Sequence, residues 1–70
     1  MLTKELEEYL PKLEEWIEIN NILSFKPNDV SKKFDLNDIN AKQLCKLAIN
    51  KEFMGFKLEK RLDGNIIVIK

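Results

Sequence analysis

The fold of this chain is indicated most clearly by residues 27–51, which read PNDVSKKFDLNDINAKQLCKLAINK. The proline that opens this stretch suits the first turn of a helix, because its φ is fixed and its missing N–H needs no partner there. We therefore predict a first helix over Pro27–Phe34 and a turn over residues 35–37. Asn37 is a favourable N-cap, so a second helix is predicted over residues 38–51. Two short helices joined by a tight turn form a helix-turn-helix.

The second predicted helix has two chemically different faces when its residues are spaced at about 100° each. The face expected to be buried holds Ala41, Leu44, Cys45 and Ala48. The opposite face carries Ile39, Lys42, Gln43, Lys46 and Asn50. Lysine can bond guanine or phosphate, and glutamine and asparagine can bond adenine, so this face suits the major groove of DNA. The alternative is that these side chains are ordinary solvent-exposed helix residues.

Residues 55–70 predict a β-hairpin that turns at Asp63 and Gly64. An Asp-Gly pair favours a type I′ turn, which needs positive φ at both central positions. The turn sets the register of the two strands. The predicted pairs are Lys57 with Lys70, Leu58 with Ile69, Glu59 with Val68, Lys60 with Ile67, Arg61 with Ile66 and Leu62 with Asn65.

This register gives the hairpin two faces. The face toward the core holds Phe56, Leu58, Ile67 and Ile69. The outer face carries Ile66 and Val68 and is more apolar than a solvated surface needs to be, so we expect the first helix or a partner to cover it. Basic residues near the tip suit phosphate contacts, or alternatively protect the edge strand from aggregation. These residues are Lys57, Lys60 and Arg61.

Residues 1–23 predict an acidic amphipathic helix. A stripe with alternating spacings of four and three consists of Leu2, Leu6, Tyr9, Leu13, Trp16, Asn20 and Leu23. Pro11 lies inside the stripe and lacks an N–H, so we expect a kink or break there, with Pro11 in the first turn of the second half. The stripe serves either as core or as a dimer interface. The candidate interface contacts on this helix are Leu6, Tyr9, Leu13 and Trp16.

The charge of the chain is divided unevenly. Its 12 basic and 12 acidic residues give a net charge of zero over 70 residues. Residues 1–21 hold two lysines against six glutamates, a net charge of −4, whereas residues 22–70 hold ten basic against six acidic residues, a net charge of +4. An acidic helix joined to a basic body indicates two faces with different partners, unless both are simply solvated surface.

The composition argues against several classes of protein. A single cysteine excludes an internal disulfide, and there is neither a signal-type apolar stretch nor a run long enough to span a bilayer. We therefore expect a cytoplasmic protein, nucleoid-associated if it binds DNA. There is no histidine, no glycine-rich phosphate loop and no metal-type cluster, so we expect no enzyme, cofactor, metal or small-molecule ligand.

Residues 25–70, with two helices followed by a hairpin, resemble the winged helix-turn-helix superfamily. The resemblance implies one α+β domain over residues 1–70, with a three-helix core, a helix-turn-helix over residues 25–51 and a two-stranded C-terminal wing over residues 55–70. It also implies that the second motif helix is the recognition helix and that the wing touches DNA beside it. The nucleic-acid contacts implied in this way are Lys42, Gln43, Lys46, Asn50, Lys57, Lys60 and Arg61.

We therefore expect a small, non-enzymatic DNA-binding protein, either a transcription regulator or an accessory of DNA replication or partition. It is expected to dimerise through its acidic helix and hairpin. The neutral net charge is similar to that of winged helices that act as protein-binding modules. The alternative function is thus a protein–protein interaction module of a larger assembly, in which the Trp16 stripe and the Ile66 and Val68 face dock on the partner.

Overall fold

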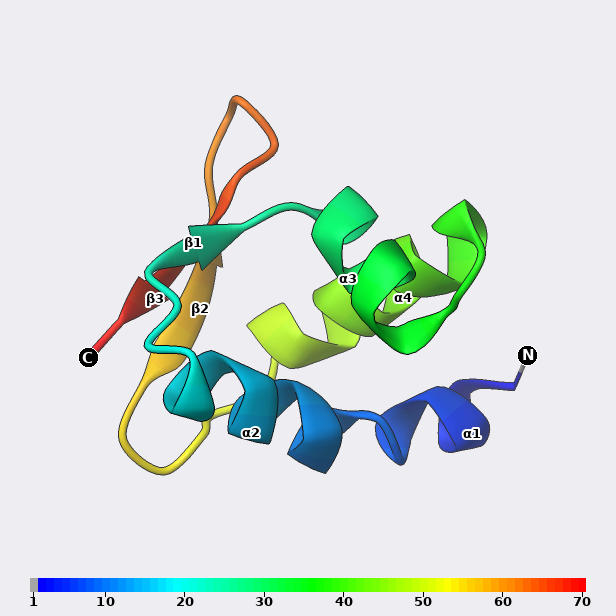
Figure 1. The fold of residues 1–70 in the computed structure, drawn as a ribbon, viewed down its shortest axis with the longest axis horizontal. Coiled ribbons are helices and arrows are strands. Elements are labelled where there is room, and N and C mark those ends of the chain that lie inside the picture. The colour runs from blue at the N-terminus through cyan, green and yellow to red at the C-terminus, as the bar shows by residue number, and fades with distance from the viewer. Residues whose placement is uncertain (1) are drawn as a thin grey trace.

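The computed structural model describes residues 2–70 as a small α+β domain (Figure 1). The elements are α1 Thr3–Glu7, α2 Leu10–Ile19, β1 Ser24–Phe25, α3 Pro27–Phe34, α4 Asp38–Ile49, β2 Lys57–Lys60 and β3 Ile66–Ile69. In Figure 1, α1 and α2 run along one side, α3 and α4 lie on the other side, and the sheet closes one end. No helix within residues 2–70 has both the length and the apolar character needed to cross a membrane.

The N-terminal helix is broken beside Pro11, as the sequence predicts. α1 ends at Glu7, and Pro11 occupies the first turn of α2. A proline is tolerated there because the N–H that it lacks would have no intrahelical partner. The N–H of Leu13 makes a regular helical bond by donating to the Tyr9 carbonyl at 2.8 Å.

The helix α3 spans the residues predicted for it, and α4 starts where predicted. The Asp29 carboxylate accepts the Lys26 N–H at 2.9 Å at the start of α3. The helix is ended by Asp35, whose φ of 53° lies in the left-handed region. Asn37 then caps α4, because its side-chain oxygen accepts the Asn40 N–H at 2.8 Å. Each boundary is thus set by a short-range bond or a backbone reversal.

The predicted end of α4 is wrong, since the helix stops at Ile49 and not at residue 51. The Asn50 side-chain amide donates to the Lys46 carbonyl at 3.1 Å, and the Asn50 N–H reaches the same oxygen at 3.4 Å. An asparagine that bonds back to the helix in this way competes with helical continuation.

The sheet has a third strand that the sequence did not reveal. β1 consists of two residues, with Ser24 opposite Ile67 and Phe25 opposite Ile66. Beyond it, the Val68 N–H donates to the Leu23 carbonyl at 2.9 Å. The strand order is β1-β3-β2, so the C-terminal strand is central and ties the segment before α3 to the hairpin.

The predicted hairpin register is wrong by one residue. The observed pairs are Lys57 with Ile69, Leu58 with Val68, Glu59 with Ile67 and Lys60 with Ile66. The Arg61 N–H donates to the Asn65 carbonyl at 2.7 Å, so the loop consists of the three residues between them. Gly64 has a φ of 91°, whereas Asp63 does not have the positive φ that a type I′ turn needs. A three-residue loop with its glycine in positive φ replaces the predicted two-residue turn.

The shift of register reverses the faces of β3. A slip of one residue turns every side chain of a strand to the other face of its sheet. Ile66 and Val68, predicted on the outer face, are buried in the core with 1% and 8% of their area exposed. Ile67 and Ile69, predicted in the core, are only half-buried, on the outer face. Ile66 and Val68 are therefore not a partner surface.

The apolar stripe of the first helices is used by the domain's own core. Leu6 and Leu13 are completely buried, so the prediction that they form a dimer interface is wrong. Tyr9 and Trp16 are half-buried, and each packs edge-on against Phe34 with ring centroids 6.0 Å apart. A domain this small needs such a stripe for its core. That Tyr9 and Trp16 also contact a partner stays a prediction.

Candidate nucleic-acid interface

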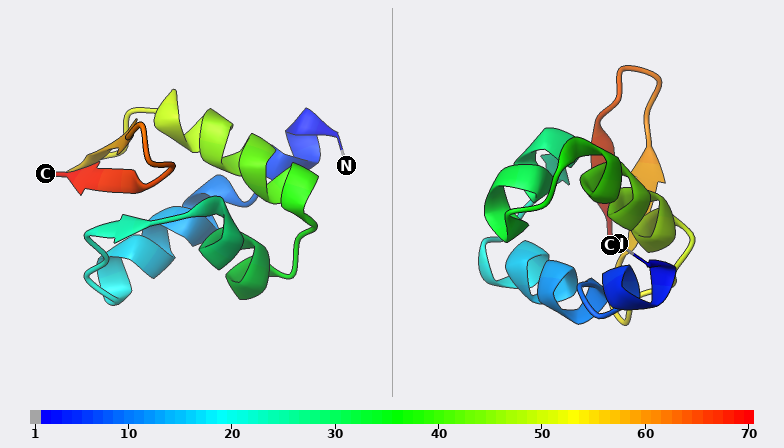
Figure 2. Two further views of the ribbon diagram at one scale, coloured as in Figure 1. Left: turned by 90° about the horizontal axis from the view of Figure 1, so that it is seen from above. Right: turned by 90° about the vertical axis from the view of Figure 1, so that its right-hand side faces the viewer.

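A groove of about 800 Å³ lies between the start of α3, one side of α4 and the hairpin. Its lining residues are Lys26, Pro27, Asn28, Lys42, Cys45, Lys46, Ile49, Asn50, Lys60, Gly64 and Ile66. Figure 2 shows the hairpin standing clear of the two helices on this side of the molecule. We call this surface the lysine groove.

Four lysines from three parts of the chain line the lysine groove. Lys26 precedes α3, Lys42 and Lys46 lie one turn apart on α4, and Lys60 ends β2. Lys60 reaches the groove because it follows Leu58 by two residues on the core-facing side of the strand. None of the residues that line this groove is acidic.

The lysines of the groove have no carboxylate partners within residues 2–70. The one ion pair found in this part of the chain joins Arg61 and Glu59, whose closest charged atoms are 3.5 Å apart on the exposed surface. Four like charges around one concavity focus a positive potential on it. The groove is therefore suited to a polyanion.

Asp63, in the hairpin loop, is an acidic residue that lies near the lysine groove without lining it. The pKa of its carboxyl is lowered, first by the Asn65 N–H that it accepts at 3.0 Å, then by the Asn65 side-chain amide at 2.9 Å. The charge of Lys26 lowers this pKa further. The Asp63 carboxylate is thus engaged by the loop and partly balanced by a lysine of the groove.

The floor of the groove is apolar and includes Cys45, Ile49 and Ile66. Burial raises the pKa of the Cys45 thiol to about 11, and the nearby charge of Lys60 opposes this shift. The thiol is therefore protonated at neutral pH and is neither a nucleophile nor a thiolate ligand for a metal. Nowhere in residues 2–70 do three or more His, Cys, Asp or Glu side chains gather as a metal site requires.

The structure brings together four of the seven residues predicted to contact nucleic acid: Lys42, Lys46, Asn50 and Lys60. Gln43 lies instead in a separate hollow of about 150 Å³, together with Thr3 and Leu6 of α1. Lys46 and Asn50 also border that hollow, so it adjoins the lysine groove.

Lys57 and Arg61 lie on the opposite face of the hairpin from Lys60. Side chains alternate along a strand, so Lys57, Glu59 and Arg61 point away from the core side. The Arg61 guanidinium accordingly contacts the Glu59 carboxylate, as an i, i+2 pair on one face. The seven predicted contacts therefore do not share one surface.

Sequence reasoning missed the contribution of Lys26, Pro27, Asn28 and Gly64 to the groove. The pattern of helices does not reveal which loops meet, and β1 brings Lys26 beside the hairpin. The basic residue directly before the helix-opening proline was the available signal.

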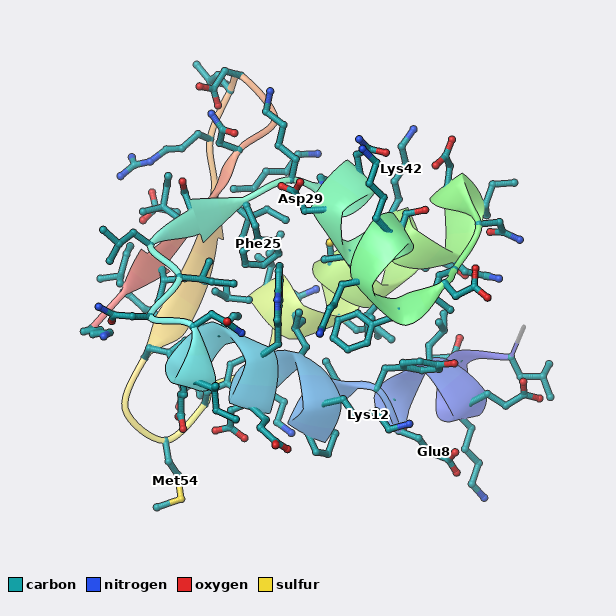
Figure 3. The ribbon with its side chains drawn as sticks, in the orientation of Figure 1. Glu8, Lys12, Phe25, Asp29, Lys42 and Met54 are labelled. Carbon is teal, nitrogen blue, oxygen red and sulfur yellow. The ribbon has the colours of Figure 1, made fainter. Side chains whose placement is uncertain are left out.

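The glutamates of the N-terminal helices lie away from the lysine groove. In Figure 3, Lys42 projects on the side of α3 and α4, whereas Glu8 and Lys12 project from the α1–α2 side. The glutamates of α1 and α2 are exposed except for Glu14, which is half-buried. The four groove lysines and the glutamates of α1 and α2 are therefore on different sides of the domain.

The outer face of the sheet is a second surface without a cover in the described chain. It carries the half-buried Ile67 and Ile69, and the exposed Leu23 lies beside β3. Lys57 and Glu59 flank these isoleucines on the neighbouring strand.

No family model matches this chain, and neither the curated proteins nor the solved structures provide a match.

Proposed function

We propose that this chain is a winged helix domain that binds duplex DNA through α4 and the lysine groove. The element order supports the fold: a helical layer, a short strand, two helices and a hairpin, with β3 between β1 and β2. In this arrangement α4 is the recognition helix and the β2–β3 hairpin is the wing.

The observation that carries this proposal is the lysine groove itself. Lys26, Lys42, Lys46 and Lys60 surround it without an acidic lining residue, and the glutamates of the N-terminal helices lie on the other side. Lysines that neutralise phosphates displace condensed counterions, which supplies most of the affinity for DNA of any sequence. The net charge of the whole chain matters less than this local potential.

α4 provides the side chains that suit the major groove. Lys42 and Lys46 are exposed one helical turn apart, and Ile39 is 73% exposed near the start of the helix. Lysine can bond guanine acceptors, and an apolar side chain can touch the thymine methyl group. Gln43 lies in the adjoining hollow and Arg61 pairs with Glu59, so we assign base contacts to Ile39, Lys42 and Lys46, and phosphate contacts to Lys26 and Lys60.

The test is fluorescence anisotropy with a labelled duplex of about 20 base pairs in about 50 to 200 mM salt. If Lys26 and Lys60 neutralise about two phosphates, log K falls against log salt with a slope of about −1.8. The double change Lys42→Glu and Lys46→Glu should abolish binding. The control Lys4→Glu with Lys12→Glu makes the same change in net charge on the α1–α2 side and should weaken binding only a few-fold.

Two results contradict the proposal. One is the absence of binding by the unaltered chain at micromolar concentration in about 50 mM salt. The other is an equal loss of affinity in the two double variants, which would mean that total charge decides binding and the groove does not.

A second function, docking on another protein, is supported by the outer face of the sheet. Ile67 and Ile69 keep part of their apolar area exposed there, beside Leu23. Sedimentation of the chain with and without Ile67→Lys measures whether a second copy binds this face. A concentration-dependent dimer that Ile67→Lys abolishes supports the docking function, and a monomer at high concentration contradicts self-association.

A further inference from the structure

The loop of the β2–β3 hairpin extends beyond the body of the domain (Figures 1 and 2). Leu62 lies in this loop and is fully exposed, more so than any other large apolar side chain within residues 2–70. Exposure of a single leucine is not unusual in itself. Leu62 is unusual because it lies at the end of a projecting loop and beside a basic groove.

The loop holds Leu62 in a defined position. The Arg61 N–H donates to the Asn65 carbonyl at 2.7 Å, and the Gly64 N–H donates to the Arg61 carbonyl at 3.1 Å. The Asp63 carboxylate accepts both the N–H and the side-chain amide of Asn65. Leu62 is therefore presented by a loop that is closed by its own hydrogen bonds, and little ordering is needed when it meets a ligand.

The loop adjoins the lysine groove. Gly64 and Lys60 line the groove from the hairpin side, and Lys26 lies near enough to Asp63 to lower its pKa. A duplex held by the groove lysines thus passes directly beside the loop. The charge of Asp63 does not oppose this approach strongly, because its oxygens accept bonds from Asn65 and Lys26 offsets its charge.

We propose that Leu62 is an apolar wedge that inserts from the minor groove between adjacent base pairs of the bound duplex. Leucine is one of the side chains that proteins insert between base steps, and the insertion unstacks the step and bends the duplex. The proposal rests on the DNA-binding function proposed above. Pyrimidine–purine steps such as TA unstack most easily, so the wedge prefers them.

The experiment uses duplexes of about 20 base pairs that carry one 2-aminopurine at successive positions around a central TA step. The fluorescence of 2-aminopurine rises when the base loses its stacking neighbour. A second set of duplexes carries a donor and an acceptor dye at the two ends, so that bending raises the energy transfer. Affinity is measured on the same samples by anisotropy.

The unaltered chain should raise both signals at one or two positions beside the TA step. Leu62→Ala should weaken binding by about tenfold or less, since it removes one apolar contact and leaves the lysines in place. Both signals should be lost even at saturating protein. Leu62→Phe should retain them, because phenylalanine also acts as a wedge.

Met54→Ala is the matched control. Met54 is 90% exposed in the segment between α4 and β2, and Figure 3 shows it projecting away from the hairpin loop. This variant should keep the affinity and both signals. Both positions are on the surface, so circular dichroism should report the unaltered fold for each variant.

The outcomes separate the wedge from DNA binding itself. Salt-dependent binding by the unaltered chain with no rise of 2-aminopurine fluorescence at any position overturns the wedge and leaves DNA binding in place. Full signals with Leu62→Ala overturn the wedge in the same way. Failure of the unaltered chain to bind any duplex overturns both proposals.

Discussion

The α1–α2 side and the lysine groove carry opposite charge and use their apolar residues in opposite ways. On the α1–α2 side the apolar stripe turns inward, so that Leu13 and Ile17 are buried and the glutamates surround them on the outside. In the groove, Ile49 is only half-buried and lies among the lysines that line it. The first region stabilises the domain, and the second leaves chemistry available to a ligand.

This difference shows why the net charge of zero is a poor guide to function. The zero is the sum of an acidic N-terminal segment and a basic remainder, and the four groove lysines of that remainder lie on a different side of the molecule from the glutamates. With a Debye length of about 10 Å at 0.1 M salt, a ligand at the groove is largely screened from the far side. The glutamates of α1 and α2 also keep the α1–α2 side of the molecule from being basic.

The largest expected effect is on stability, and it compares one apolar residue from each side. Leu13→Ala removes a completely buried side chain from the α1–α2 side and should lower the free energy of unfolding by about 2–5 kcal/mol. Ile39→Ala on α4 removes an exposed side chain and should change it by less than about 0.5 kcal/mol. Urea unfolding monitored by the fluorescence of Trp16 measures both.

The order of the two effects should reverse when affinity for DNA is measured in place of stability. Ile39→Ala should lower the affinity while leaving stability intact, and any Leu13→Ala protein that is folded should bind normally. If instead Ile39→Ala destabilises the domain as much as Leu13→Ala, the division into a structural side and a binding side is wrong.

A smaller effect distinguishes two lysines of the same hairpin. Lys60→Ala removes a groove lysine, whereas Lys57→Ala removes a lysine from the opposite face of the sheet. Loss of one phosphate contact should reduce the salt slope by about 1, and only Lys60→Ala should produce that reduction. Equal slopes in the two variants would contradict the assignment of Lys60 to the groove.

The local elements could be predicted from the sequence because short-range chemistry decides them. Pro27, Asn37 and Pro11 each act on the nearest turn of chain, and the structure has a helix start, a cap and a break at these residues. The α+β composition of the domain follows from the same signals. Such features need no knowledge of what packs against them.

The faces of the hairpin could not be predicted reliably, because they depend on one loop. An Asp-Gly pair suits a two-residue turn, but here the Asp63 side chain bonds to Asn65 and stabilises a three-residue loop with Gly64 alone in positive φ. The third loop residue places Ile66 in the core where Ile67 was predicted. β1, with two residues, had no alternation from which to be recognised.

The same limit explains which site residues were found. Lys42 and Lys46 were identified because helix periodicity alone puts them on the exposed side of α4. Lys26 was missed because its place in the groove depends on β1 pairing with β3. Arg61 was wrongly predicted on the same surface as Lys60. Its side chain continues the strand alternation past the end of β2 and therefore lies on the face of Glu59.

The smallest expected effect concerns Asp63, the acidic residue of the hairpin loop beside the groove. The lowered pKa of Asp63 means that its carboxylate is favoured in the folded state, so its contribution to stability is present above the ordinary value of 3.8 and is lost as the pH falls through the lower folded-state value. Asp63→Asn keeps an oxygen that can accept the Asn65 N–H but cannot titrate. The unaltered chain should therefore melt slightly above Asp63→Asn at neutral pH, and the difference should vanish in acid.

The same variant also tests the charge of the groove, since removing the carboxylate near Lys26 leaves the groove more positive. Asp63→Asn should bind duplex DNA somewhat more tightly at neutral pH, with the gain shrinking as salt rises. A melting difference that stays constant across pH would show that the hydrogen bond, and not the charge, supports the loop. If the affinity does not change, the charge of Asp63 does not contribute to the electrostatic potential at the bound DNA. The contrast between the two sides of the molecule would then rest on the four lysines alone.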